Sequence, residues 1–125
     1  GSRVPHGTTA MGRAYLASLP EAQRAEFIEQ YREITPRKEW PMVLAGIQQA
    51  VEDYAQYGFC LSLGEWNPEV WAVGTPMASS DGSRILAFNV SGPVFNMTRE
   101  RLIADIGPRL CRLRDQVLSA TGGNF

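Results

Sequence analysis

Apolar residues recur every three or four positions in three segments of the first half of the chain, and this spacing predicts three helices. The first helix includes residues 11–17. Thr8 or Thr9 can cap it, because a threonine hydroxyl accepts a hydrogen bond from a first-turn N–H group. Pro20 suits the start of a second helix, which is expected to end near Thr35.

The third helix is predicted from Pro41 to Gly58, and it is amphipathic. Its apolar stripe consists of Val43, Leu44, Ile47, Val51 and Tyr54. The polar residues Gln48, Gln49, Glu52 and Asp53 lie outside this stripe, so we expect them to face water.

Two apolar runs after the third helix, 59–63 and 70–77, are typical of strands, and a loop over 65–68 separates them. Gly74 and Pro76 fall inside the second run. Because proline has no N–H to donate and glycine has no side chain to pack, they predict a bulge or an exposed end there.

Residues 79–83 form a strong turn signal around Asp-Gly, so the second strand should pair with a third strand over 84–91 as an antiparallel hairpin. Residues 85–88 are all apolar, which predicts that this third strand is covered on both faces. Such a strand needs neighbours, either from sequence missing here or from a second subunit.

A last helix is predicted after Thr98, which can cap it, and Gly122 ends it. Its apolar stripe consists of Leu102, Ile106, Leu110, Leu113 and Val117. Pro108 lies inside the stripe and should kink the helix or split it in two. Three helices, three strands and a final helix describe an α+β fold with helices against an antiparallel sheet.

Composition and charge argue against two classes of function for these residues, DNA binding and membrane association. The 125 residues suit one domain, and 12 basic residues against 13 acidic ones leave a net charge of -1. With no basic surplus and no recognition helix, we expect no measurable DNA binding by these residues at physiological salt. No apolar stretch is long enough to span a bilayer, so no membrane partner is expected.

No constellation of residues predicts a metal site or an active site. Cys60 and Cys111 form no CxxC motif, and His6 is the only histidine, so we expect reduced thiols in a cytosolic protein and no metal or cofactor. The serines of the 79–83 turn are ordinary turn residues. Glu65 and Glu69, which flank the residues 66–68, should be solvated loop charges. We therefore predict no catalytic residue and no enzyme.

Three stretches together resemble the effector-binding region of IclR-type transcriptional regulators. The first combines GSRVP at 1–5 with TTAMGRAYLASLP at 8–20. The second runs from Gly58 through the hairpin to NVSGP at 89–93, and the third is the predicted C-terminal helix, 98–118. The resemblance covers nearly the whole chain and keeps the order of the elements.

The resemblance implies a GAF-like or profilin-like sensor domain that binds a small organic acid, in a cytoplasmic regulator that is a homodimer or tetramer. The chain has no helix-turn-helix, and it resembles the family only from a point after the first effector-domain strands. We therefore expect residues 1–125 to be an effector-binding domain with an incomplete sheet. DNA contact would belong to an N-terminal domain outside them. The alternative is a small enzyme or an oligomerisation module of similar α+β fold.

The resemblance also carries over a pocket, at the start of the first helix and on the strands. Its positions in this chain are Ala10, Met11, Ser62, Val70, Ala72, Asn89 and Ser91. Ser62 stands where the family is often acidic or polar, which suggests a different effector. Asn89 and Ser91 are spaced by two and share one face of a strand. The open alternative is that these two only satisfy backbone groups, while Val70 and Ala72 pack in the core.

The expected ligand is a small organic acid with its carboxylate near Thr9, Ala10 and Met11. The first turn of a helix offers N–H groups without internal partners, and the helix dipole favours an anion there. Asn89 and Ser91 would bind the far polar end of the ligand, and Met11, Val70 and Ala72 would contact its carbon skeleton.

Overall fold

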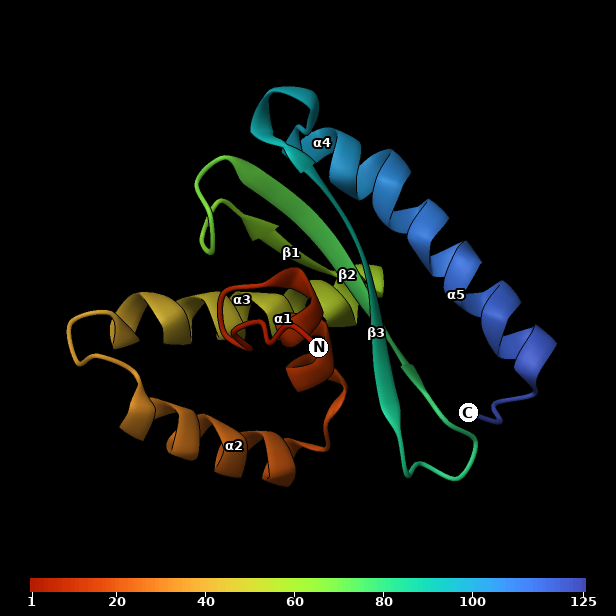
Figure 1. Ribbon diagram of the computed structural model, residues 1–125, viewed down its shortest axis with the longest axis horizontal. Coiled ribbons are helices and arrows are strands. Elements are labelled where there is room, and N and C mark those ends of the chain that lie inside the picture. Colours follow the sequence, from red (N-terminus) through yellow and green to blue (C-terminus); the bar gives the residue numbers. More distant parts are fainter.

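An antiparallel sheet of three strands, in the order β1-β2-β3, lies between two layers of helices in the computed structural model (Figure 1). The structure describes residues 1–125. α1 and α3 cover one face of the sheet, and α5 crosses the other. The elements are α1 (Ala10–Ser18), α2 (Glu21–Ile34), α3 (Trp40–Tyr57), β1 (Cys60–Leu63), β2 (Val70–Ala78), β3 (Ile85–Pro93), η1 (Val94–Asn96), α4 (Arg99–Arg101), η2 (Leu102–Ile106) and α5 (Gly107–Thr121). The predicted α+β class and order of elements are confirmed.

β2 and β3 form the predicted hairpin, but β2 has neither a bulge nor an exposed end at Gly74 and Pro76, which are both buried. The pairing runs without interruption from Val70 opposite Pro93 to Ala78 opposite Ile85. Pro76 fits because β1 pairs with β2 only as far as Gly74, so β2 has a single neighbour at Pro76. Pro76 can therefore be buried in a regular strand without losing a second ladder bond.

At Gly74, α1 packs closely against the sheet. A β-carbon at this position would lie 2.6 Å from the carbonyl oxygen of Ala10, which real side chains do not tolerate. The glycine therefore serves close packing of α1 on β2 rather than a break in the strand. This contact sets the start of α1 directly above the strands.

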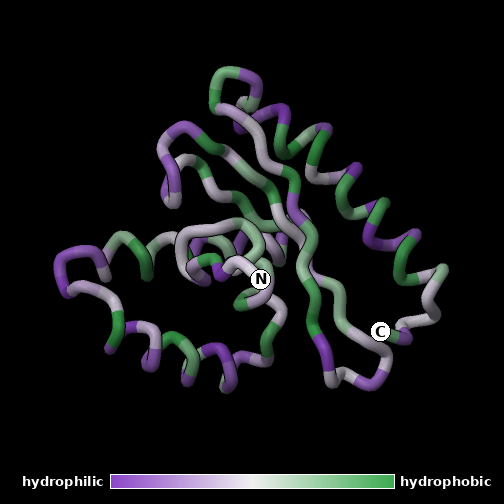
Figure 2. The backbone as a smooth tube through the Cα atoms, in the orientation of Figure 1, coloured by the Kyte–Doolittle hydropathy of each residue, from purple (hydrophilic) through white to green (hydrophobic).

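The core has one cluster on each face of the sheet. Between the sheet and the C-terminal helices, the buried side chains are Phe59, Leu61, Val73, Leu102, Ile106 and Leu110. On the other face, small residues let α1 and α3 pack tightly: Ala14, Ala17, Ala50 and Cys60. Figure 2 shows hydrophilic and hydrophobic residues alternating along α2 and α5, as expected for helices with one face toward the protein and one toward water.

The C-terminal helix is split, as Pro108 predicts. Thr98 caps it by accepting a hydrogen bond from the N–H of Arg101 at 3.0 Å. The next turn, η2, is π-helical, and the N–H of Gly107 bonds the carbonyl of Leu102, five residues earlier. A wider turn just before Pro108 moves away the carbonyl that the proline ring would otherwise strike.

β3 is an edge strand, and the expectation that both its faces are covered is wrong. Leu86 is 46% exposed and Val90 is 37% exposed, although both lie in a strand rich in apolar residues. β3 pairs only with β2, so nothing in this chain covers its outer edge. A run of apolar residues shows that a strand can be buried on both faces. It does not show that this chain supplies the elements that would bury it.

α2 has no buried residue. It contacts the rest of the molecule through a series of aromatic rings. The ring of His6 lies 4.9 Å from that of Phe27 on α2 and 5.6 Å from that of Tyr15 on α1, measured between centroids. The chain of rings continues from Phe27 to Tyr31 and from Tyr31 to Trp40. His6 thus has a packing role.

We expect the stability of the protein to fall between pH 7.5 and pH 5.5 because of His6. Burial lowers the pKa of His6 below its usual value of about 6.5. The unfolded chain therefore binds a proton at a higher pH than the folded chain, and stability decreases as pH falls through about 6.5 toward the folded pKa. Urea unfolding of wild type and His6→Phe at both pH values measures this. An equal pH dependence in the two proteins would contradict the prediction.

Candidate functional site

A cavity of about 210 Å³ lies at the N-terminal end of α1, above the strands and beside the β1–β2 loop. All seven pocket positions predicted from the sequence line it: Ala10, Met11, Ser62, Val70, Ala72, Asn89 and Ser91. Val4, Thr9 and Trp66 complete the lining, and Val4 and Trp66 are additions that sequence reasoning missed. None of the ten lining residues carries a charge.

The start of α1 provides the strongest polar groups of the cavity. Thr9 is the cap, and its hydroxyl accepts a hydrogen bond from the N–H of Gly12 at 3.1 Å. No hydrogen bond within the chain uses the N–H groups of Ala10 and Met11. Two free donors at the positive end of a helix dipole favour an anion.

The strands provide the wall opposite α1. Ser62, Ala72 and Ser91 lie side by side across β1, β2 and β3, because Ala72 is in register with both of the others. Val70 and Asn89 precede two of these residues by two positions and therefore lie on the same face. Asn89 and Ser91 are exposed, and no hydrogen bond within the chain uses their side chains. They are free to bind a ligand.

Ser62 has a structural task in this wall. Its side chain is only 4% exposed, and its hydroxyl donates a hydrogen bond to the carbonyl oxygen of Thr8 at 2.6 Å. This bond ties the segment before α1 to β1. A ligand would meet Ser62 as a hydrogen-bond acceptor, because its one proton is already shared with Thr8.

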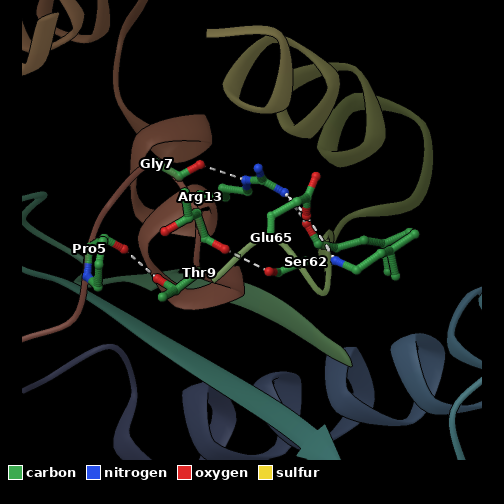
Figure 3. A network of polar contacts seen from close by, with 9 residues as sticks. Pro5, Gly7, Thr9, Arg13, Ser62 and Glu65 are labelled. Carbon is green, nitrogen blue, oxygen red and sulfur yellow. Dashed lines mark hydrogen bonds and ion pairs between the residues drawn. The ribbon is translucent and has the colours of Figure 1, made fainter. Parts of the chain in front are cut away.

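A buried arginine on α1 connects the segment before α1 with β1 and the β1–β2 loop (Figure 3). Arg13 on α1 is 3% exposed, and its guanidinium donates to the carbonyls of Gly7 at 2.9 Å and Leu61 at 3.0 Å. It also donates to the carboxylate of Glu65 in the β1–β2 loop at 2.7 Å. The sequence predicts a solvated charge at Glu65, and its side chain is indeed 40% exposed, but its carboxylate also pairs with an arginine 52 residues away in the chain.

Asp53 also departs from expectation, because it is 5% exposed rather than facing water. It lines a second cavity, of about 260 Å³, together with Arg13, Arg99 and the amide of Gln49. Gln49 donates a hydrogen bond to Asp53 at 3.1 Å. Asp53 therefore turns toward the Arg13 network, whereas its neighbour Glu52 is exposed as predicted.

The two cysteines are unpaired, and the buried one is unreactive. Burial first, and then the nearby carboxylate of Asp53, raise the pKa of the Cys60 thiol to about 12, although Arg13 acts in the opposite direction. A thiol of this kind stays protonated at neutral pH. No group of three or more His, Cys, Asp or Glu side chains is arranged to hold a metal ion.

Two serines of the hairpin turn use their hydroxyl groups in hydrogen bonds within the turn. The hydroxyls of Ser79 and Ser83 both donate to the carboxylate of Asp81 at 2.7 Å. The backbone N–H of Ser83, followed by these two hydroxyls, lowers the pKa of Asp81 to about 2. The turn is thereby explained as local structure.

Comparison with known proteins identifies the family. The model of the bacterial transcriptional regulator IclR C-terminal family matches residues 1–117, so the chain belongs to this family. An HTH-type transcriptional regulator, TsaQ1/TsaQ2 of Comamonas testosteroni, is 26% identical over 110 residues, which is 88% of this chain and 39% of that protein. The chain therefore corresponds to the C-terminal domain of such regulators.

Solved structures share the fold. The crystal structure of an IclR family transcriptional regulator from Brucella abortus is 40% identical with a TM-score of 0.90, over 96% of this chain and 45% of that one. The inducer-binding domain of PobR from Acinetobacter, a double mutant in complex with 3-hydroxybenzoic acid, is 24% identical with a TM-score of 0.70. That match covers 94% of this chain and 67% of the other. None of the helices described above is long and apolar enough to cross a membrane.

Proposed function

We propose that this chain is the small-molecule-sensing domain of an IclR-type transcription factor, and that its effector is a small organic acid bound in the cavity at the start of α1. The signal would pass to a DNA-binding domain outside residues 1–125. The observation that carries the proposal is the meeting of two free helix N–H groups, at Ala10 and Met11, with an uncharged cavity of about 210 Å³. The inducer-binding domain of PobR, which has the same fold, supports it.

The cavity divides into parts that suit such a ligand. The carboxylate would accept hydrogen bonds from Ala10 and Met11, where the helix dipole supplies the positive field that no side chain of the lining provides. The carbon skeleton would lie against Met11, Val70 and Ala72. Asn89, with its free amide at the open edge of the sheet, would bind a polar group at the far end.

We expect Asn89→Leu to weaken binding of the effector about 2- to 10-fold, because it removes one neutral hydrogen bond. Calorimetric titration with a panel of small carboxylates measures the effect. Asn96→Leu is the matched control, since Asn96 lies in η1 and does not line the cavity. Equal affinity in wild type and Asn89→Leu would remove Asn89 from the site.

We also expect residues 1–125 to self-associate through the open edge of β3. This strand has unpaired backbone groups along its outer side, and the half-exposed side chains of Leu86 and Val90 lie beside them. Val90→Lys should shift the equilibrium toward monomer, because a charge at an edge opposes strand pairing. Light scattering at about tens of micromolar tests this, in the range where weak interfaces fill. A monomer in wild type would refute it.

A further inference from the structure

We propose that Trp66 is the residue that selects the body of the effector, and that it selects a flat ring. This inference rests on the proposed function, because it concerns the same cavity. Trp66 lines that cavity from the β1–β2 loop, and its side chain is 53% exposed. No other aromatic ring of the chain packs against it, whereas Trp40 packs against Tyr31. A large, half-exposed indole therefore lines an uncharged cavity without an aromatic partner.

The loop that carries Trp66 is held in one position, which a selective contact requires. At its base, the N–H of Gly64 bonds the carbonyl of Val70 at 3.2 Å, and the N–H of Val70 bonds the carbonyl of Asn67 at 2.9 Å. The residue just before Trp66 is Glu65. One of its carboxylate oxygens accepts both the N–H of Leu63 at 2.9 Å and the guanidinium of Arg13 at 2.7 Å.

Arg13 and Glu65 are thus positioning residues for Trp66. Arg13 also binds the carbonyl of Gly7, in the segment that leads into α1, so one guanidinium connects the two sides of the cavity (Figure 3). Gly46 on α3 leaves the room for it, because a β-carbon there would overlap the guanidinium. Trp66 and the start of α1 are therefore held at a fixed spacing across the cavity.

The chemistry of the lining defines the ligand that fits between them. A second carboxylate would find no cationic side chain in the lining, so the ligand is a monocarboxylate. Besides Trp66, the cavity has an apolar lining at Met11, Val70 and Ala72. An indole face prefers a flat ring, and an aromatic pair contributes beyond the area it buries. The ligand class is therefore an aromatic monocarboxylate.

Benzoate and cyclohexanecarboxylate form the probe pair, because both carry one carboxylate on a six-membered ring and only benzoate is flat. We expect wild type to bind benzoate about three- to tenfold more tightly, the range of an aromatic contact. Trp66→Leu should lose this preference while keeping its affinity for cyclohexanecarboxylate, and Trp66→Phe should restore part of it. Phe95→Leu, which changes a ring that is 83% exposed and outside the cavity, should behave as wild type.

The fluorescence of Trp66 tests the positioning role of Glu65 separately. In a Trp40→Phe, Trp71→Phe background, Trp66 is the only indole, and its fluorescence should change when benzoate binds. Glu65→Gln should alter that emission and reduce the preference for benzoate. The control Glu69→Gln, in the same loop, should do neither, because no hydrogen bond or ion pair within the chain uses the Glu69 carboxylate. Identical behaviour of the two glutamine variants would exclude Glu65 as a positioning residue.

The outcomes separate this inference from the proposed function. If wild type binds both acids but Trp66→Leu retains the preference, or loses affinity for both acids equally, the role of Trp66 is refuted and the sensor function stands. If wild type binds neither these acids nor any other small carboxylate, the proposed function fails and the inference fails with it.

Discussion

Ala10→Pro is expected to weaken carboxylate binding about 10- to 100-fold while leaving α1 folded. The substitution removes one of the two free N–H groups at the start of the helix, and a hydrogen bond to a charged group contributes about 1.5–3 kcal/mol. Proline is compatible with the first position of a helix. Thr9, which precedes it, already has the extended backbone that proline requires, with φ -100° and ψ 152°. Calorimetry with the same panel of small carboxylates measures the loss.

The chain contains a close control for this substitution. Thr98 caps α4 with φ -101° and ψ 155°, so Arg99 occupies the same place in α4 that Ala10 occupies in α1. Arg99 does not line the proposed effector cavity. Arg99→Pro should therefore retain binding, and circular dichroism should show native helix content in both variants. Full affinity in a folded Ala10→Pro protein would mean that the anion does not bind at this helix end.

Arg13→Met is expected to lower the free energy of unfolding by about 3 kcal/mol, near the lower end of the range for breaking a buried ion pair. The carbonyls of Gly7 and Leu61 would lose their donor. The cost stays near the lower end because the Glu65 side chain is 40% exposed and remains hydrated. Urea denaturation monitored by circular dichroism measures the change.

Arg109→Met is the matched control for Arg13→Met. Arg109 also pairs with a carboxylate, that of Asp105 at 3.6 Å, but the two side chains are 67% and 49% exposed. Exposed pairs of this kind contribute about 0–1 kcal/mol. If the two variants lose the same stability, the Arg13 network is no more important than a surface ion pair.

The parts of the fold that local signals determine were predictable from the sequence. The hydroxyls of Thr9 and Thr98 cap helices within their own first turns, and Asp81-Gly82 makes a turn with its immediate neighbours. Pro108 splits the last helix for a steric reason that also lies within a few residues. Such features depend on contacts close in sequence and need no knowledge of the tertiary structure.

Most of the departures depend on whether distant segments meet. Glu65 is paired because Arg13 reaches it across 52 residues, and Asp53 is buried because α3 packs beside the same arginine. Pro76 is tolerated in a regular strand because β1 ends before it. Periodicity describes one element at a time, so it could not indicate which charged side chain meets a partner on another element.

The residues that line the effector cavity were predictable only in part. The resemblance to the family supplied all seven positions, and alternation along β3 added only that Asn89 and Ser91 share one face. Val4 and Trp66 lie outside helices and strands, where no periodicity assigns a side chain to a face. The one available signal was the large apolar side chain of Trp66 in an otherwise polar loop.

An amide-resolved NMR titration of the ¹⁵N-labelled protein with small carboxylates tests the central claim most directly. The claim is that an organic acid binds with its carboxylate at the start of α1. It predicts the largest shifts at the amides of Ala10 and Met11, with smaller ones at Asn89 across the cavity. Largest shifts at Gly46 and Gln49, which line the cavity beside Asp53, or no saturable shift with any carboxylate, would contradict the claim.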